Sequence, residues 1–331
     1  MAITMKDVAK KAGVSLSTVS RVINDSSLVS KDTSIRVKKA IDELDYQIND
    51  SARALRTNIS NLIGIIGAGM DNPFLMEVLI SLETEAIKDG YNIIYGDSEG
   101  ELEQELYYIN MFKQKKIDGL VILTANFSEE LIKAVKKSKI PSVFASGYLE
   151  DPELPAVTVN NIKAAEDVSR YLLKTADYFG IIRGPYRDSV ASEERMKGII
   201  NVFNNKNIEL KDKYIAEGDF SYKSGYECAK TLLNNNPNLN SIFAFSDQMA
   251  IGAIKYCIDN NIKIPQDISI VGFDGIEASK YVSPSLSTVF QSGTELGTEI
   301  MKVLMKKINN EEIENNKIFI PHKLIKRESS K

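Results

Sequence analysis

Hydroxyl and guanidinium side chains follow one another closely in the run Ser15-Leu16-Ser17-Thr18-Val19-Ser20-Arg21. Such groups hydrogen-bond to phosphate oxygens, and arginine also bonds the edge of a guanine in the major groove of DNA. The run therefore suits recognition of a nucleic acid. A solvated polar face of a helix is the plain alternative for this segment taken alone.

Three short helices are expected to position this run. Helical spacing predicts the first over residues 5–12, with Gly13 ending it, and the third over about 31–44, capped by Ser30. The second begins after a short turn, with Ser15 or Ser17 as its cap. Two helices joined by a turn containing glycine form the helix-turn-helix pattern. The expected buried positions are Val8, Ala9, Ala12, Val19, Val22 and Ile23.

The charge distribution supports a basic head on an acidic body. The whole chain of 331 residues has a formal net charge of -4, which is unexpected for a partner of a polyanion. Residues 1–60, however, hold 10 Lys and Arg against 7 Asp and Glu, so the excess of acid lies in the remainder. Residues 49–57 contain two arginines among small side chains, and we expect a linker able to become a short helix.

From residue 61 onward, short apolar runs alternate with helical stretches, as in a parallel sheet whose strands are buried on both faces. Two successive sets of strands predict two doubly wound lobes, with a ligand crevice at the carboxyl ends of the strands. A helix over 293–308 and a last strand around 317–326 are expected to cross back between the lobes. The expected strands are 62–66, 92–95, 119–123, 142–145 and 156–159, then 179–182, 214–217, 242–245, 268–272 and 287–290.

The predicted fold is a small all-α helix-turn-helix headpiece followed by an α/β core of two doubly wound parallel-sheet lobes. The headpiece takes residues 1–48 and the hinge 49–60. One lobe takes residues 61–160 with about 291–319, and the other takes 161–290 with about 320–331.

Several classes of function lose support from the composition. The only histidine, His322, follows a proline near the end of the chain, where a surface role is expected, and this disfavours His-dependent catalysis and zinc. Gly67-Ala68-Gly69 lacks the third glycine of a dinucleotide-binding loop, because Asn72 stands there. We expect no enzyme activity, no cofactor and no metal.

The location of the chain is also predicted. No apolar run approaches the roughly 20 residues that cross a bilayer. The first residues lack the layout of a secretory signal, so we expect a cytoplasmic protein. Cys228 and Cys257 are expected to be buried thiols in helices.

One segment makes the resemblance to a known family specific: Thr4-Met5-Lys6-Asp7-Val8-Ala9-Lys10-Lys11-Ala12-Gly13-Val14-Ser15-Leu16-Ser17-Thr18-Val19-Ser20-Arg21-Val22-Ile23-Asn24. It resembles the headpiece of the LacI/GalR family of bacterial repressors. Further matching segments, such as Asn72-Pro73-Phe74 and Val271-Gly272-Phe273-Asp274, extend the resemblance over essentially the whole chain.

The resemblance implies a homodimer that places two recognition helices in successive major grooves of a pseudo-palindromic operator in double-stranded DNA. By position, Leu16, Ser17 and Arg21 match the family's base-reading residues. Arg53 is expected to contribute to the salt dependence of binding. The implied phosphate contacts are Thr4, Ser15, Thr18, Ser20 and Asn24.

The resemblance also implies a hinge helix that forms on DNA, in which Leu55 matches the leucine that wedges into the minor groove. Two residues depart from the family's pattern just before it. Ile48 stands where a proline is usual, and Asp50 adds a negative charge near the phosphates. Coupling between hinge and operator is where this chain is expected to differ from its relatives.

The lobes resemble sugar-binding proteins of the periplasmic type, which implies allosteric control by a small effector in the cleft. Ser146 replaces the usual acidic residue and Ser246 the usual asparagine, which weakens the expectation of a hexose. Residues 150–159 are more similar to those of the family's cytidine-responsive repressors, so a sugar or a nucleoside, phosphorylated or not, is expected. Pro321-His322-Lys323 is similar to the family's catabolite regulators, which use a phosphorylated carrier as corepressor; such a regulator and a pure solute-binding protein are the alternatives. The implied effector contacts are Phe74, Ser146, Arg195, Phe220, Ser246 and Asp274.

Overall fold

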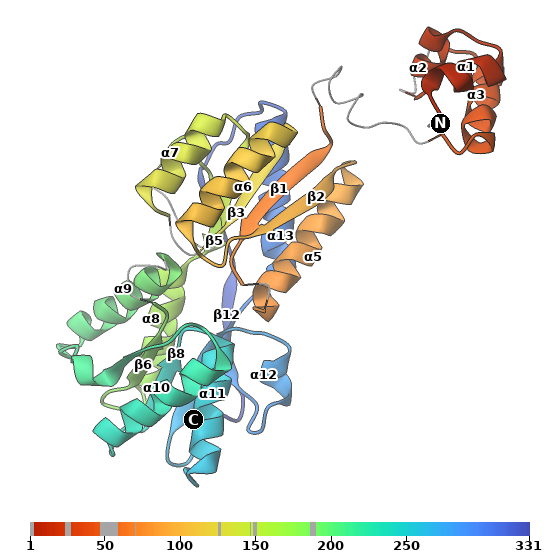
Figure 1. The fold of residues 1–331 in the computed structure, drawn as a ribbon. Helices are drawn as coiled ribbons and strands as arrows, with labels where there is room; N and C mark the ends of the chain where they lie inside the picture. The colour runs from red at the N-terminus through yellow and green to blue at the C-terminus, as the bar shows by residue number, and fades with distance from the viewer. Residues whose placement is uncertain are drawn as a thin grey trace. The chain divides into compact units, whose positions relative to one another are not determined.

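The computed structural model describes residues 3–23, 28–46, 59–69, 71–124, 127–145, 147, 151–185 and 190–331. The chain divides into two compact units, Met1–Ser60 and Asn61–Lys331 (Figure 1). Within the described ranges, no helix is long and apolar enough to cross a membrane.

The described residues of the first unit form three helices, α1 (Met5–Ala12), α2 (Leu16–Ile23) and α3 (Lys31–Glu43). Gly13 ends α1 with φ of 66°, a left-handed conformation that glycine adopts without steric cost. This confirms the predicted helix-turn-helix. The helices enclose a small apolar core made of Val8, Ala9, Ala12, Val19, Val22, Val37 and Ala40.

The second unit begins with a six-stranded parallel sheet in the order β11-β5-β4-β3-β1-β2. Its apolar residues form two buried clusters, one beneath α6 and α7 and the other beneath α5. Each strand therefore has both faces covered, as the continuous apolar runs predict. The elements are β1 (Leu62–Gly67), α5 (Pro73–Lys88), β2 (Asn92–Asp97), α6 (Leu102–Lys115), β3 (Gly119–Leu123), α7 (Glu129–Ser138), β4 (Ser142–Ala145) and β5 (Ala156–Val159).

A second sheet of six strands follows, in the order β12-β10-β9-β8-β6-β7. All its pairs are parallel except β10 with β12, which is antiparallel. These two sheets, parallel apart from the pair β10 and β12, confirm the predicted fold class. The elements are α8 (Asn161–Leu172), β6 (Gly180–Arg183), α9 (Val190–Asn205), η1 (Asp212–Tyr214), β7 (Ile215–Glu217), α10 (Tyr222–Asn235), β8 (Ser241–Ala244), α11 (Asp247–Asp259), β9 (Ser269–Asp274), α12 (Ala278–Tyr281) and β10 (Ser287–Gln291).

The end of the chain belongs to both sheets. Helix α13 (Gly293–Ile308) packs against α5, and β11 (Lys317–Ile320) pairs with β5 in the first sheet. Strand β12 (His322–Ile325) then pairs with β10 in the second. The single strand expected around residues 317–326 is therefore two strands. Pro321 separates them, and a proline has no backbone N–H for a sheet ladder.

Helices α10 and α11 pack closely because glycine stands at the contact. A Cβ atom added to Gly225 would lie 2.1 Å from the carbonyl oxygen of Met249, and one added to Gly252 would lie 2.0 Å from that of Tyr222. The same two helices carry Cys228 and Cys257, both buried free thiols, as the sequence predicts.

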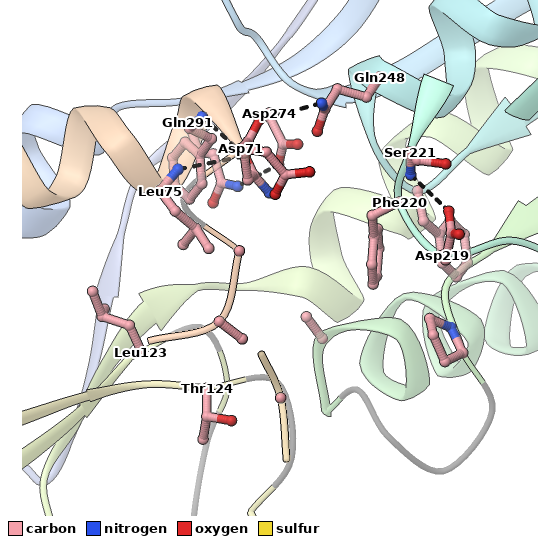
Figure 2. A pocket seen from close by; sticks show the side chains of 18 of the residues that line it. Asp71, Leu75, Leu123, Thr124, Asp219, Phe220, Ser221, Gln248, Asp274 and Gln291 are labelled. Carbon is pink, nitrogen blue, oxygen red and sulfur yellow. Dashed lines mark hydrogen bonds between the residues drawn. The ribbon is translucent and has the colours of Figure 1, made fainter. Parts of the chain in front are cut away.

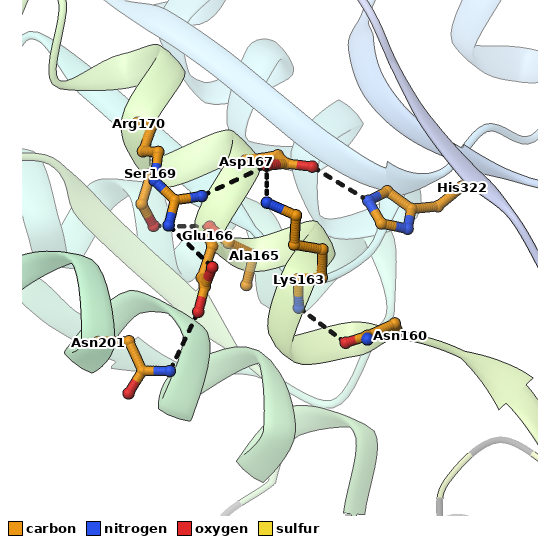
Figure 3. A network of polar contacts seen from close by, with 9 residues as sticks. All are labelled: Asn160, Lys163, Ala165, Glu166, Asp167, Ser169, Arg170, Asn201 and His322. Atoms are coloured by element: carbon orange, nitrogen blue, oxygen red, sulfur yellow. Dashed lines mark hydrogen bonds and ion pairs between the residues drawn. The ribbon is translucent and has the colours of Figure 1, made fainter. Parts of the chain in front are cut away.

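A polar network joins α8 to β12 and α9 (Figure 3). The Nε2 atom of His322 lies 3.3 Å from Oδ2 of Asp167, and the other oxygen of this carboxylate accepts a 3.0 Å hydrogen bond from Lys163. The preceding residue, Glu166, accepts hydrogen bonds from Arg170 and from Asn201 of α9. The histidine thus helps to fix the last strand on the second sheet.

Candidate functional site

The exposed face of α2 carries the hydroxyl groups that the sequence singled out. The Oγ of Ser15 accepts a 3.1 Å hydrogen bond from the backbone N–H of Thr18, so Ser15 and not Ser17 caps the helix. The same Oγ lies 2.8 Å from the hydroxyls of both Ser17 and Thr18. Leu16 and Arg21 are exposed, with 44% of Leu16 accessible to solvent, while Ser20 is half-buried.

Thr4 precedes α1 and is exposed. Its backbone N–H and its hydroxyl donate hydrogen bonds of 2.8 and 2.6 Å to the carboxylate of Asp7. These bonds from Thr4 lower the pKa of Asp7, because they stabilise its charged form. The geometry fixes the entry of the chain into the first helix.

Several predicted DNA contacts lie outside the described residues: Asn24, Arg53 and Leu55, together with the unusual Ile48 and Asp50. Their roles stay predictions.

A cavity of about 440 Å³ opens in the second unit (Figure 2). It brings together four of the predicted effector contacts, which come from separate parts of the chain. Phe74 lies in the first turn of α5, Arg195 in α9, Phe220 after β7 and Asp274 at the end of β9. The cavity thus lies where several strands end, as expected for open α/β sheets.

The guanidinium of Arg195 is buried and is held from several directions. Its Nε donates a 3.0 Å hydrogen bond to Oδ1 of Asn161, and a terminal nitrogen donates to the carbonyl oxygen of Phe245. Its Cζ lies 3.5 Å from the centre of the Phe273 ring, in cation–π contact. Burial lowers the pKa of Arg195 to about 10, against the opposing effect of nearby carboxylates, chiefly Asp274. The side chain therefore stays charged at neutral pH.

Asp274 is the buried acid of the cavity, with 8% of its surface exposed. Its Oδ1 accepts a 2.9 Å hydrogen bond from the side-chain amide of Gln291. Burial raises the pKa of Asp274 to about 6, although Arg195 and Gln291 favour the charged form. Its φ of 114° lies in a region that residues with a side chain rarely adopt. A carboxyl held in this way is suited to bond the hydroxyl or amide of a ligand.

A second buried acid, Asp247, supports the end of β9. Its Oδ2 accepts hydrogen bonds of 2.8 and 2.9 Å from the backbone N–H groups of Gly275 and Ile276, and its Oδ1 accepts one of 2.5 Å from Thr288. Burial raises the pKa of Asp247 well above its usual value, and the neighbouring carboxylate of Asp274 adds to the effect. Asp247 fixes the backbone directly after Asp274.

Both predicted aromatic contacts line the cavity. Phe74 is 7% exposed and also belongs to the core, whereas Phe220 is half-buried, with φ of 68°. The Phe220 ring packs over Gly184, where an added Cβ would lie 2.1 Å from the ring. A larger residue at position 184 would displace the ring from the cavity.

Of the two predicted serines, the structure describes only Ser246. Ser246 is buried and caps α11, accepting a 3.2 Å hydrogen bond from the N–H of Met249. It is not among the residues that line the cavity, and its expected contact with an effector stays a prediction. Ser146 lies outside the described part of the chain.

Other lining residues were missed by the reasoning from sequence. Gln291 ends β10, Gln248 begins α11 and Asp71 follows β1. The Nε2 of Gln248 donates a 3.5 Å hydrogen bond to the backbone oxygen of Asp71, which joins segments attached to different sheets. Their position in the sequence could have identified them, because each stands at or a few residues beyond the carboxyl end of a predicted strand.

Thr124 was also missed; it follows β3 and lines the cavity. Its hydroxyl donates to Glu105, a buried acid whose pKa is raised by burial. Within the described residues, no group of three His, Cys, Asp or Glu side chains is arranged to hold a metal ion.

Comparisons with known proteins agree with this geometry. The family described as "Bacterial regulatory proteins, lacI family" matches residues 4–49, and that described as "Periplasmic binding proteins and sugar binding domain of LacI family" matches residues 60–328. The chain is 33% identical to the HTH-type transcriptional regulator RegA of Clostridium saccharobutylicum and 31% identical to catabolite control protein A of Priestia megaterium, in both cases over 100% of both chains.

Among solved structures, the Lac repressor bound to ONPG in its repressed state superposes with a TM-score of 0.88. It is 25% identical in sequence, and the match covers 100% of both chains. With its helix-turn-helix head and its two-sheet effector-binding unit, this chain belongs to the LacI family of bacterial transcriptional regulators.

Proposed function

We propose that the chain represses transcription by binding a pseudo-palindromic operator as a homodimer, and that a small sugar or nucleoside-type effector in the cavity changes its affinity for DNA. One observation carries the proposal. The same chain holds an exposed face of hydroxyls and arginine on a helix-turn-helix, and a polar cavity at the strand ends of its α/β unit.

In the head, Leu16, Ser17 and Arg21 would read base edges, because they are exposed on α2. The hydroxyl groups at the start of that helix would contact phosphates, which favour the positive end of a helix. The remaining proposed phosphate contacts are Thr4, Ser15, Thr18, Ser20 and Asn24, with Arg53 and Leu55 in the hinge.

In the cavity, Asp274 and Arg195 would bond the polar groups of the effector, and Phe220 would cover an apolar face of its ring. Phe74, which also belongs to the core, would line the same cavity. Gln291 would hold Asp274 in place through its 2.9 Å hydrogen bond. Ser146 and Ser246 complete the proposed set, the second by fixing the start of α11.

The effector would act by changing how two lobes lie against each other. We assign residues 61–160 with 291–319 to one lobe and residues 161–290 with 320–331 to the other, the head being residues 1–48 and the hinge 49–60. A ligand shifts such an equilibrium only when it binds one arrangement more tightly. The hydrogen bond between Gln248 and Asp71 joins the two proposed lobes, so a change in how the lobes lie would act directly on this contact.

Catalysis is not part of the proposal, because relatives such as RegA and PurR, which match 98% or more of this chain, are named as a transcriptional regulator and a transcriptional repressor. Since its partner would be chromosomal DNA, the protein would act in the cytoplasm.

A gel shift with the purified chain and the promoter fragments flanking its own gene tests the proposal. The proposal is supported if the chain retains one fragment in preference to a random fragment and if Arg21→Ala loses this preference. Equal affinity for all fragments would contradict it. Lys133→Ala is the matched control, because Lys133 is an exposed cation on α7 in the other unit.

A second candidate function is catabolite control with a phosphorylated carrier protein as corepressor. The 31% identity with catabolite control protein A over the whole chain favours it. A gel shift in the presence and absence of such a carrier would decide, since only this function requires the carrier for tight binding.

A further inference from the structure

The residues that line the cavity are strongly unbalanced in charge. Among the described lining residues there are five carboxylates and one guanidinium, that of Arg195. Four of the carboxylates, Asp71, Glu99, Glu101 and Asp219, are exposed, and we call them the acidic lining set. Figure 2 shows Asp71 and Asp219 with Phe220 around the cavity. Even if Arg187, the one basic residue in the undescribed segments of this unit, faced the cavity, the carboxylates would remain in excess.

The positive charge of Arg195 is already opposed within the protein. Asp274 and Glu194 both stabilise its charged form, and two of its nitrogens donate to Asn161 and to the carbonyl oxygen of Phe245. One face of the guanidinium also covers the Phe273 ring. An anionic group on a ligand would add a second negative charge beside Asp274, and Arg195 is the one cation among the described lining residues.

Five of the helices that begin at the cavity have part of their positive end already occupied by a side chain of the protein. Helix N-termini bind phosphate through free backbone N–H groups. Each of these five helices has its capping residue or a residue near its start in the lining, and each donates at least one such N–H group to its own capping side chain. The capping residues are Asn72 of α5, Asn160 of α8, Ser221 of α10, Ser246 of α11 and Ser292 of α13.

Helix α6 also begins at the cavity, and its start is acidic. Glu101 stands at its N-cap, and Glu103 and Glu105 lie in its first turn. Carboxylates at this end of a helix already satisfy the positive end of the helix dipole. A phosphate approaching here would meet like charges.

We infer that the effector of this chain is an uncharged or cationic polyhydroxylated molecule, a free sugar or nucleoside, and that phosphorylated forms are excluded. This inference rests on the proposed function of the cavity and narrows its ligand class. The acidic lining set repels anions while they approach. The charges of Asp274 and Arg195 already oppose each other, so hydrogen-bonding groups without a negative charge suit this part of the cavity.

The charge of the cavity can be measured before any effector is known. Ala68 and Ala191 are half-buried lining residues, so Ala68→Cys and Ala191→Cys each place one thiol there. Each thiol is modified with two methanethiosulfonate reagents, one bearing a trimethylammonium group and the other a sulfonate. Each rate is divided by the rate at which the same reagent modifies 2-mercaptoethanol in solution, which removes the difference in intrinsic reactivity. The native Cys228 and Cys257 are buried, and the unsubstituted protein gives their background.

We expect the normalised rate for the cationic reagent to exceed that for the anionic reagent by about ten-fold, and the ratio to fall toward one in about 1 M salt. Glu99→Gln, Glu101→Gln and Asp219→Asn together should bring the ratio close to one. Glu130→Gln, Glu312→Gln and Glu314→Gln change the net charge equally at exposed positions outside the lining and should leave it unchanged. A ratio at or below one at both probe positions, or the same fall in the control triple variant, would overturn the inference.

Ligand pairs test the class directly. Melting temperatures are measured with ribose and ribose 5-phosphate, glucose and glucose 6-phosphate, and adenosine and its 5′-monophosphate. Stabilisation by the uncharged member of a pair supports the inference, and greater stabilisation by the phosphorylated member overturns it. Neither experiment measures operator binding. Failure of the proposed repressor function would therefore show separately, in the gel shift.

Discussion

The side-chain amide of Gln291 donates a 2.9 Å hydrogen bond to the carboxyl of Asp274, and both residues line the cavity of the α/β unit. Gln291 ends β10, directly before the chain leaves the second sheet for α13. The hydrogen bond therefore links the buried acid of the cavity to a segment that crosses toward the first sheet.

Asp274→Asn should abolish the response to effector and leave operator binding intact. The variant keeps the size of the side chain but loses the carboxylate that we propose to bond the ligand. Gel shifts with and without the stabilising ligand measure both properties. Loss of operator binding together with the response would contradict the assignment of Asp274 to the effector site.

The same substitution should change how stability depends on pH. Because burial raises the pKa of Asp274 to about 6, the folded chain keeps a proton that the unfolded chain, with a value near 3.8, has already released. The free energy of unfolding should therefore fall as the pH rises from about 4 to about 6. The asparagine of Asp274→Asn does not titrate, so the variant should not show this fall. The difference in the free energy of unfolding, variant minus parent, should increase by up to about 3 kcal/mol as the pH rises through that window.

Asp219→Asn is the control for the pH experiment. Hydrogen bonds from Ser221 and Ser224 lower the pKa of Asp219, so this carboxylate contributes stability above its unfolded pKa that is lost as the pH falls. In the parent, Asp219 should make the free energy of unfolding rise with pH, whereas Asp274 makes it fall. Asp219→Asn should remove this rise. Urea unfolding at several pH values measures both, and equal slopes in the two variants would contradict the prediction.

Arg21→Ala should relax base preference at one position of each operator half-site, because an arginine bonded to guanine discriminates by about 1 to 3 kcal/mol. Lys6→Gln, on exposed α1, should instead weaken binding to all sequences and reduce the slope of log K against log salt by about 0.9 if it neutralises one phosphate. Competition with operator variants at several salt concentrations separates the two effects. An unchanged base preference in Arg21→Ala would argue against base contact by this residue.

Gly225→Ala should destabilise the α/β unit by about 1 to 3 kcal/mol, because the added methyl group would meet the carbonyl oxygen of Met249 at 2.1 Å. Thr231→Ala, at an exposed position of the same helix, should change stability by less than about 0.5 kcal/mol. Urea unfolding of the whole chain compares them. Similar stabilities would show that α10 and α11 separate at little cost.

The native thiols should resist modification in the folded protein. Burial raises the pKa of Cys228 to about 11 and that of Cys257 to about 12, which leaves little thiolate near neutral pH. An aromatic disulfide reagent should label them at the rate of unfolding, and rapidly in urea. Prompt labelling of either thiol at pH 7.5 without denaturant would contradict their burial.

Local sequence determined most of the secondary structure. The apolar runs at 119–123, 142–145 and 156–159 are strands with the predicted limits, and helices α1 and α13 also have theirs. These segments could be predicted because periodicity and capping residues act over a few neighbours. The strand around 317–326 shows the limit, since only pairing with two different sheets decided that Pro321 divides it.

The sequence by itself determined the helix-turn-helix, the two sets of parallel strands and, through resemblance, four residues that the structure gathers in one cavity. Only the tertiary structure decided which other groups join them. Gln291 is 17 residues from Asp274, and Asp71 is 177 residues from Gln248, yet each pair is hydrogen-bonded. Contacts of this kind depend on strand order and helix packing, which no local pattern specifies. The excess of acid around the cavity follows from the same packing, because Asp71, Glu99, Glu101 and Asp219 come together only when their strand ends do.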